Sequence, residues 1–366
     1  MTTIEWTDRT WNPTTGCDRI SRGCDHCYAL TTARRLKGMG QAKYQRDGNP
    51  KTSGPGFGLS VHADVLAAPL TWSTPQMVFV NSMSDLFHKD VPEDFIARVW
   101  TVMAATPQHT YQILTKRHDR MRSIVRRIAW RTPTTEERQR GVRGSVAYVQ
   151  PNEKLNDHLG EPRLLPNVWL GVSVEDQTWG DIRIPALLET PAAIRFLSCE
   201  PLLGPVDLRN LQARNRALID CLGGDVKSAD DGAVYTSTPS VIDWVIAGGE
   251  SGPGARPMHP DWARSLRDEC VSAGVAFHFK QWGAWCPPHP DHGQSIFGHV
   301  TNEDACQVVT KAGNLRGRPW PGWGIQDGTR DACVMRRYPK GKAGRTLDGR
   351  TWDEFPASAT AAAVNA

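Results

Sequence analysis

The sequence predicts an α/β protein, built as a partial or near-complete parallel β/α barrel of the TIM-like type with surface insertions. From Met77 onward, six short apolar runs alternate with helix-like segments, which is typical of repeated βα units. Nearly every run ends in polar or charged residues, as expected where parallel strands open onto a functional rim at their carboxyl ends. A doubly wound open sheet, which also binds ligands at these strand ends, is the competing arrangement.

The first strand is expected in the Trp-rich segment that ends at Pro13, directly before a cysteine loop at 16–28. Apolar positions at helical spacing predict a helix over Tyr28 to Lys37, and the Gly-, Lys- and Pro-rich residues 38–58 predict a loop. Two further helices are expected over Glu93 to Ala105 and His118 to Trp130. The six later strands are expected within 77–80, 111–116, 168–176, 193–201, 243–252 and 275–283.

The barrel is expected to occupy residues 1–290. Polar segments rich in Gly, Thr or Pro interrupt it at 131–165 and 207–240, which predicts two surface insertions. The repeating pattern fades in a C-terminal extension, 291–350. The small-residue tail at 351–366 is expected to be flexible.

Composition places the chain among cytoplasmic enzymes. Its 366 residues, 39% of them hydrophobic, can bury one large core or two modest ones, and a formal charge of +4 does not by itself imply nucleic acid. Nine cysteines are too sparse for a disulfide scaffold. No signal peptide or apolar stretch of membrane length is present, so no membrane partner is expected.

Three cysteines stand within eleven residues, as Cys17, Cys24 and Cys27 in the spacing C-x6-C-x2-C. Thiolates clustered in a polar loop are typical of a site for zinc, Cu(I) or an iron–sulfur cluster. A structural zinc site would need a fourth ligand, such as His26 or His62. A four-iron cluster held by three cysteines instead leaves one iron open to a substrate or cofactor.

This loop resembles the cluster-binding loop of the radical S-adenosylmethionine (SAM) superfamily, with the first cysteine gap lengthened from three residues to six. The wider pattern G-C-x-x-I-S-x-G-C-x-x-C-Y-A looks like a phage-associated three-cysteine family without a settled function. The radical SAM resemblance implies a [4Fe–4S] cluster on the three cysteines, with the open iron chelating the methionine moiety of SAM. It further implies an electron donor such as flavodoxin or ferredoxin, whose electron cleaves the sulfonium.

The same resemblance implies contacts to SAM. The His26 backbone is placed to contact adenine, and Asp85, at the end of the second strand, to accept the methionine ammonium. Ser173 and Glu175 are candidates for the ribose hydroxyls, and Glu200 is expected to face the same cavity.

A glycine turn at 248–252 brings together Gly248, Gly249 and Glu250. Its backbone N–H groups could cradle a carboxylate or phosphate, while a tight strand-to-helix turn explains the glycines equally well. Further candidates for substrate or SAM carboxylate contacts are Lys116, Arg256, Lys280 and Gln281.

Two other groups of residues have both a functional and a structural explanation. A basic helix could contact the phosphates of DNA or RNA or be an ordinary solvated face, and its arginines are Arg117, Arg120, Arg122, Arg126 and Arg127. Near the C-terminus, Cys286, His289 and His292 stand close together, which we attribute to coincidence because no C-x2-C pair accompanies them.

Three functions therefore remain open from the sequence. The first is a radical SAM-type enzyme that modifies a substrate, with nucleic acid as one candidate. The second is a zinc-stabilised, non-catalytic nucleic-acid-binding protein. The third is a barrel enzyme with a structural metal site, whose chemistry would use the carboxylates of Glu175, Glu200 and Glu250.

Overall fold

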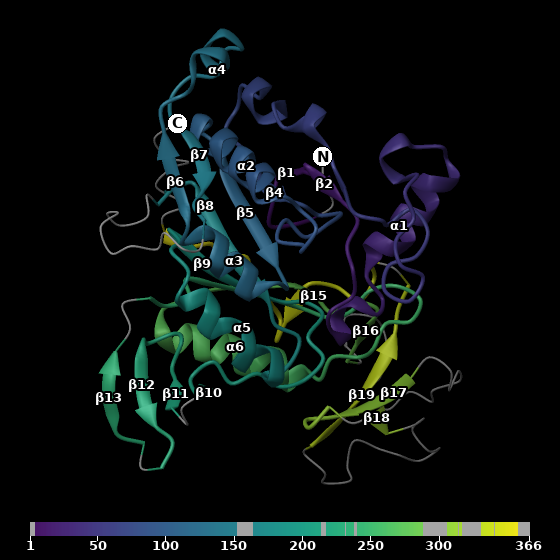
Figure 1. Cartoon of the computed structure of the whole chain (residues 1–366). Helices are drawn as coiled ribbons and strands as arrows, with labels where there is room; N and C mark the ends of the chain where they lie inside the picture. The colour runs from purple at the N-terminus through teal and green to yellow at the C-terminus, as the bar shows by residue number, and fades with distance from the viewer. Residues whose placement is uncertain are drawn as a thin grey trace. The chain divides into compact units, whose positions relative to one another are not determined.

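The main feature of the fold is a seven-stranded sheet with the strand order β1-β4-β5-β8-β9-β14-β15 (Figure 1). Its strands are all parallel and the sheet curls as a half-barrel, so the predicted α/β class and partial TIM-like barrel are confirmed. The computed structural model describes residues 4–151, 164–213, 217–230, 232–237, 240–287, 306–313, 315–316, 331–339 and 341–357.

The seven strands lie where the sequence predicts them. They are β1 (Arg9–Trp11), β4 (Met77–Val80), β5 (Thr110–Thr115), β8 (Val168–Ser173), β9 (Ile194–Cys199), β14 (Trp244–Gly248) and β15 (Ala276–Gln281). Every residue of β8 is buried, as expected for a parallel strand that is covered on both faces. The polar residues that follow each apolar run lie at or beyond the strand ends and form the connecting loops.

Helices follow several strands, as the βα pattern predicts. They are α1 (Tyr28–Gly38), α2 (Glu93–Ala105), α3 (His118–Val125), α5 (Gln177–Leu188) and α6 (Pro260–Ala273). Short 3-10 turns, η2 to η4, span Ala42–Tyr44, Ala63–Val65 and Ala68–Thr71. Among the described residues, no helix has the length and apolar character needed to cross a membrane.

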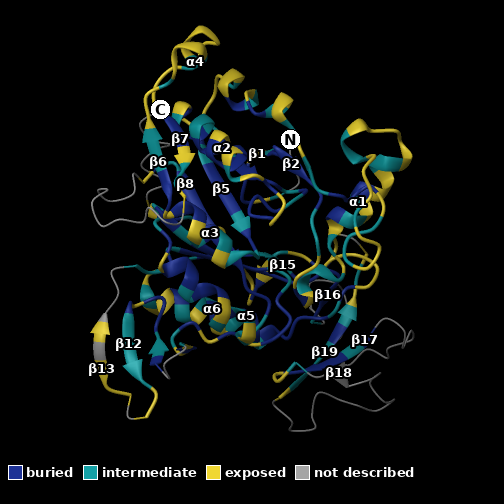
Figure 2. Ribbon diagram, in the orientation of Figure 1, coloured by how far each residue is buried: buried dark blue, intermediate teal, exposed yellow. Residues whose placement is uncertain are grey.

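The helix expected through Trp130 ends at Val125, which corrects that prediction. Residues Ile128–Arg131 form strand β6 instead, which pairs antiparallel with β7 (Val146–Val149). The first part of the predicted insertion at 131–165, residues 132–145, is thus the tip of a hairpin, and residues 152–163 lie outside the described residues. This tip carries α4 (Thr135–Gln139), which a Thr134 capping box begins, and it is largely exposed (Figure 2).

The chain divides into two compact units. The first unit comprises Met1–Val172 and Ala186–Phe196, and the second comprises Ser173–Pro185 and Leu197–Asn365. The region predicted as one barrel, 1–290, therefore contributes to both units.

Tryptophans form much of the core of the first unit. Trp6 packs edge-on against Phe79, with ring centroids 4.7 Å apart, and also contacts Phe196. The buried Trp11 donates from its indole N–H to the Val65 carbonyl at 2.9 Å. The Trp11 indole thus meets its polar requirement inside the core, and both rings serve packing there.

In the second unit, β14 and β15 pair in parallel, and two small antiparallel sheets accompany them. The insertion at 207–240 forms β10 (Leu211–Gln212), β11 (Ala217–Ile219), β12 (Asp225–Ser228) and β13 (Val234–Ser237). The C-terminal extension forms β16 (Trp285–Cys286), β17 (Cys306–Thr310), β18 (Leu315–Arg316) and β19 (Ala332–Arg337). A short hairpin, β20 (Thr346–Leu347) and β21 (Arg350–Thr351), follows.

The first part of the predicted flexible tail is anchored in the second unit. The Trp352 carbonyl accepts a hydrogen bond from the Phe279 amide at 2.8 Å, and the Phe355 ring lies 5.1 Å from that of Trp244. Partial burial of these two aromatic residues explains why the chain stays packed beyond 351. The remainder of the predicted tail, 358–366, lies outside the described residues.

Candidate metal centre at the cysteine loop

A close backbone approach forms the start of the cysteine loop. After β1, strand β2 (Thr14–Thr15) pairs with β3 (Ser60–Val61), and Gly16 follows with a φ of 87°. A Cβ at Gly16 would lie 2.3 Å from the Gly58 carbonyl oxygen, so only glycine fits here. The Cys17 amide then donates to the Phe57 carbonyl at 3.3 Å, which fixes the first cysteine against the 46–60 loop.

The other two cysteines lie at the start of helix α1. Cys24 ends a single 3-10 turn, η1 (Arg22–Cys24), and Cys27 occupies the N-cap position of α1. All three cysteines are half-buried and free of disulfides. The N-terminal end of a helix favours negative charge, so this position offsets part of the cost of burying a Cys27 thiolate.

The three thiols share one electrostatic environment. Burial raises the pKa of Cys17 to about 12 and raises that of Cys27, and a charge on Cys24 adds to both shifts. Cys17 and Cys27 also pack against one apolar cluster, formed by Ala29, Ala33, Phe57 and Met83. Without a metal, the Cys17 and Cys27 thiols hold their protons, and a bound metal would displace these protons.

A buried ion pair lies next to Cys17. The guanidinium of Arg117, two residues beyond the end of β5, donates from Nη1 to Cys17 Sγ at 3.3 Å and to Asp85 Oδ2 at 2.9 Å. Burial opposes the charge of this guanidinium, but Asp85 and Cys17 raise its pKa. The sequence motifs pointed to Asp85, whereas Arg117 was noted only as part of a basic helix.

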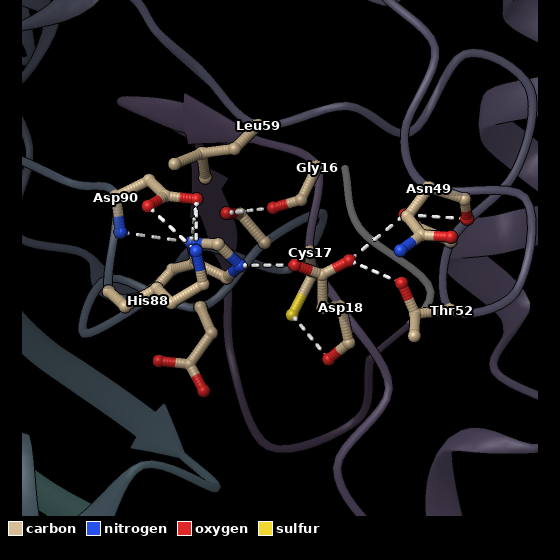
Figure 3. A network of polar contacts seen from close by, with 12 residues as sticks. Gly16, Cys17, Asp18, Asn49, Thr52, Leu59, His88 and Asp90 are labelled. Atoms are coloured by element: carbon tan, nitrogen blue, oxygen red, sulfur yellow. Dashed lines mark hydrogen bonds and ion pairs between the residues drawn. The ribbon is translucent and has the colours of Figure 1, made fainter.

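Asp18 ties the cysteine loop to two other segments (Figure 3). Its carboxylate accepts hydrogen bonds from Thr52 Oγ1 at 2.6 Å and Ser53 Oγ at 3.1 Å, and its other oxygen lies 3.0 Å from His88 Nε2. Burial works against the charge of Asp18, but these hydrogen bonds lower its pKa below the usual value. Sequence reasoning missed this network because its members lie in three separate loops.

Replacing Asp18 with alanine is expected to lower the free energy of unfolding by about 2 kcal/mol, because three hydrogen-bonding groups lose their partner. Thermal unfolding of the metal-free protein measures this effect. The matched control is Asp64→Ala, since Asp64 is exposed and forms only a 3.7 Å ion pair with Lys43. Equal melting temperatures for the two variants would show that the network does not stabilise the loop.

Zinc and a four-iron cluster place different demands on the thiols. Among the residues that the structure describes, no group of three or more His, Cys, Asp or Glu side chains could hold a metal ion as it stands. Zinc requires its ligands at about 2.3 Å from one centre, whereas a four-iron cluster binds each thiolate on a different iron, so its thiols lie farther apart. Of the two histidines considered as a fourth ligand, His62 contacts Thr15 Oγ1 at 2.8 Å and His26 is exposed. The choice between zinc and an iron–sulfur cluster therefore stays a prediction.

Two hollows border the cysteine loop in the first unit. One, of about 660 Å³, is lined by Cys24 and the predicted adenine neighbour His26. The other, of about 640 Å³, is lined by Cys17 and His88. The first two thiols of the motif, Cys17 and Cys24, are thus within reach of small molecules.

The candidates in the second unit are engaged in ion pairs. Glu175 and Arg183 form a 2.8 Å pair in which both side chains are fully buried, and Ser173 contributes its carbonyl to the same guanidinium. Glu200 lies 3.2 Å from Lys280. Their roles toward SAM stay predictions.

The glycine turn after β14 has a structural explanation. A Cβ at Gly248 would lie 2.6 Å from Glu200 Oε1, and one at Gly249 would lie 2.0 Å from the Trp282 carbonyl oxygen. Glu250 accepts three hydrogen bonds from Arg256, at 2.6 to 2.8 Å. Close packing therefore accounts for both glycines, and the anion cradle stays a prediction.

Four of the five arginines of the predicted basic helix are engaged inside the first unit. Their partners are Asp85 for Arg117, the His88 and Val91 carbonyls for Arg120, Asp119 and Glu189 for Arg122, and Glu93 for Arg127. These contacts compensate most of the charge that a phosphate backbone would require. A DNA or RNA partner stays a prediction that this helix does not support.

Two of the C-terminal cysteines, Cys286 and Cys306, lie on different strands, β16 and β17. Cys286 and Cys306 each pair with Arg336 of the central strand β19, and both are free and buried. His289 and His292 lie outside the described residues.

The comparisons with known proteins give one family. None of the curated proteins and none of the solved structures matches the chain. A family described as "Protein of unknown function (DUF5131)" matches residues 1–356. This match covers both units and the cysteine loop, so the chain belongs to the DUF5131 family.

Proposed function

We propose that this protein is an iron–sulfur enzyme of the radical SAM type, in which Cys17, Cys24 and Cys27 hold a [4Fe–4S] cluster whose open iron binds SAM. The observation that supports it is the donor set. Three free, half-buried thiols lie in the loop after β1, and a guanidinium from the end of β5 donates to one of them. In the proposed cluster, three cysteine ligands would leave one iron open for a cofactor.

When bound, such a cluster would supply the reductive cleavage of SAM. One electron from an external donor breaks the sulfonium carbon–sulfur bond, which releases methionine, and the deoxyadenosyl fragment gains one hydrogen atom to become 5′-deoxyadenosine. An electron donor such as a flavodoxin or ferredoxin belongs to this proposal. A DNA or RNA substrate belongs to it as the candidate suggested by the sequence.

The chain's own residues prepare the site. The apolar cluster beneath Cys17 and Cys27 limits water on one side of the thiols. Lys116 lowers the cost of negative charge on Cys27, and Arg117 does the same for Cys17. Positive groups at two of the three thiols favour the deprotonated forms that bind iron.

The proposed SAM contacts differ in what they would require. His26 lines a hollow beside Cys24, so it can approach a ligand there without rearrangement. The Asp85 carboxylate already accepts several hydrogen bonds, so an ammonium would have to compete with them. Glu175 would have to leave Arg183 to bind a ribose.

An anaerobic cleavage assay tests the proposal. Protein reconstituted with iron and sulfide, then reduced with dithionite, is expected to convert SAM to 5′-deoxyadenosine and methionine in equal amounts. Omitting the reductant should stop the reaction. A colourless protein that binds zinc instead of iron would support the zinc-stabilised alternative, and an intact cluster without cleavage would support a structural cluster.

A further inference from the structure

Arg117 is a fixed cation beside the first cysteine. Its side chain is 12% exposed. Besides the bonds from Nη1 to Cys17 Sγ and Asp85, its Nη2 donates to the Asp18 carbonyl at 3.1 Å. The guanidinium thus contacts a proposed ligand, the backbone after that ligand, and a carboxylate.

Asp85 in turn is held by the strand end behind it. Thr115 Oγ1 donates to both of its oxygens, at 2.8 and 2.9 Å, and the Lys116 and Phe87 amides donate at 3.1 and 3.0 Å. The carboxylate therefore cannot turn away without losing several bonds. This anchoring fixes the direction of Arg117 toward the sulfur.

Hydrogen bonds and charges close to cluster sulfurs set the reduction potential of an iron–sulfur centre. Reduction adds one negative charge, so a nearby cation stabilises the reduced state and a nearby anion destabilises it. Both effects are strong in a buried setting, where solvent screens charges poorly. Arg117 and Asp85 carry opposite charges, but only Arg117 touches the sulfur.

We infer that Arg117 and Asp85 form a tuning pair that sets the reduction potential of a cluster bound at Cys17, with Arg117 raising it and Asp85 lowering it. This inference rests on the proposed function. The step concerned is transfer of one electron from an external reductant to the cluster, in which no bond breaks and no proton moves. Both residues act through Cys17 and are positioning residues.

Two variants with opposite expected effects test the pair. A redox titration, followed by the electron paramagnetic resonance signal of the reduced cluster without SAM, measures the potential. Arg117→Met should shift the equilibrium about tenfold toward the oxidised cluster, which is 59 mV for one electron. Asp85→Asn should shift it in the opposite direction, and Arg117→Lys should lie closer to the wild-type protein than Arg117→Met.

Arg122→Gln is the matched control, because Arg122 lies on the same helix but pairs with Asp119 and Glu189. Its potential should equal that of the wild-type protein. Unchanged potentials in both test variants, or shifts in the same direction, would overturn the inference while leaving the proposed function intact. If Arg117→Met holds no cluster, the Asp85→Asn variant alone tests the inference: a shift toward the reduced cluster supports it, and no shift or a shift toward the oxidised cluster overturns it. If the wild-type protein assembles no cluster, both the proposed function and this inference fail.

Discussion

Replacing Cys24 with alanine is expected to abolish both iron binding and SAM cleavage. Cys24 is the middle one of the three proposed ligands, and a charge on it acts on both other cysteines. Its loss leaves only two sulfurs to hold the cluster. Iron and sulfide content after anaerobic reconstitution, followed by the 5′-deoxyadenosine assay, measures the effect. Cys17→Ala and Cys27→Ala are expected to give the same result.

Cys333→Ala provides the control, because Cys333 is also a half-buried free thiol but belongs to the second unit. It should retain wild-type iron content and cleavage. Equal iron loss in all four variants would point to unfolding or nonspecific binding. Full iron content in Cys24→Ala would show that the cluster, if present, uses other ligands.

Replacing Glu175 with alanine is expected to destabilise the protein by about 3–5 kcal/mol. The change leaves the fully buried Arg183 without the carboxylate that it contacts at 2.8 Å, and a buried charge without its counter-charge is costly. Urea unfolding followed by tryptophan fluorescence measures the loss. The double variant Glu175→Leu/Arg183→Met should recover much of the stability, because it removes both charges together.

This experiment also separates the two roles considered for Glu175. A large loss of stability in Glu175→Ala that the double variant reverses would identify a structural ion pair. Unchanged stability together with weaker SAM binding would instead assign Glu175 to the ribose, as the sequence resemblance implies.

The six strands after β1 could be predicted from the sequence because each consists of a short, mostly apolar run that turns polar at its end. Periodicity failed after Val125, where Ile128 and Trp130 continue an apolar pattern that suits a helix or a strand. Residues Ile128–Arg131 form a strand because they pair with β7, and a local apolar pattern does not reveal a partner that lies farther along the chain. The predicted flexible tail is rich in small residues, which is why the sequence predicts flexibility from residue 351 onward. Its first residues are instead held in place by contacts of Trp352 and Phe355.

The candidate site was predictable only in part, for a related reason. Cys17, Cys24 and Cys27 are close in sequence, and their spacing is enough to predict a metal site. Arg117 follows β5, one hundred residues after Cys17, and reaches it only because β1, β4 and β5 are neighbours in the sheet. Its position directly after a predicted strand was the available signal, since parallel strand ends converge on one edge.

The central claim is that the three cysteines hold a four-iron cluster with one iron open to SAM. The most direct measurement is the electron paramagnetic resonance spectrum of the reduced, reconstituted protein before and after SAM is added, alongside iron and sulfide analysis. The account predicts about four irons and four sulfides per chain and a spectrum that changes when SAM binds. A zinc-loaded protein without sulfide, or a cluster whose spectrum is indifferent to saturating SAM, would contradict it.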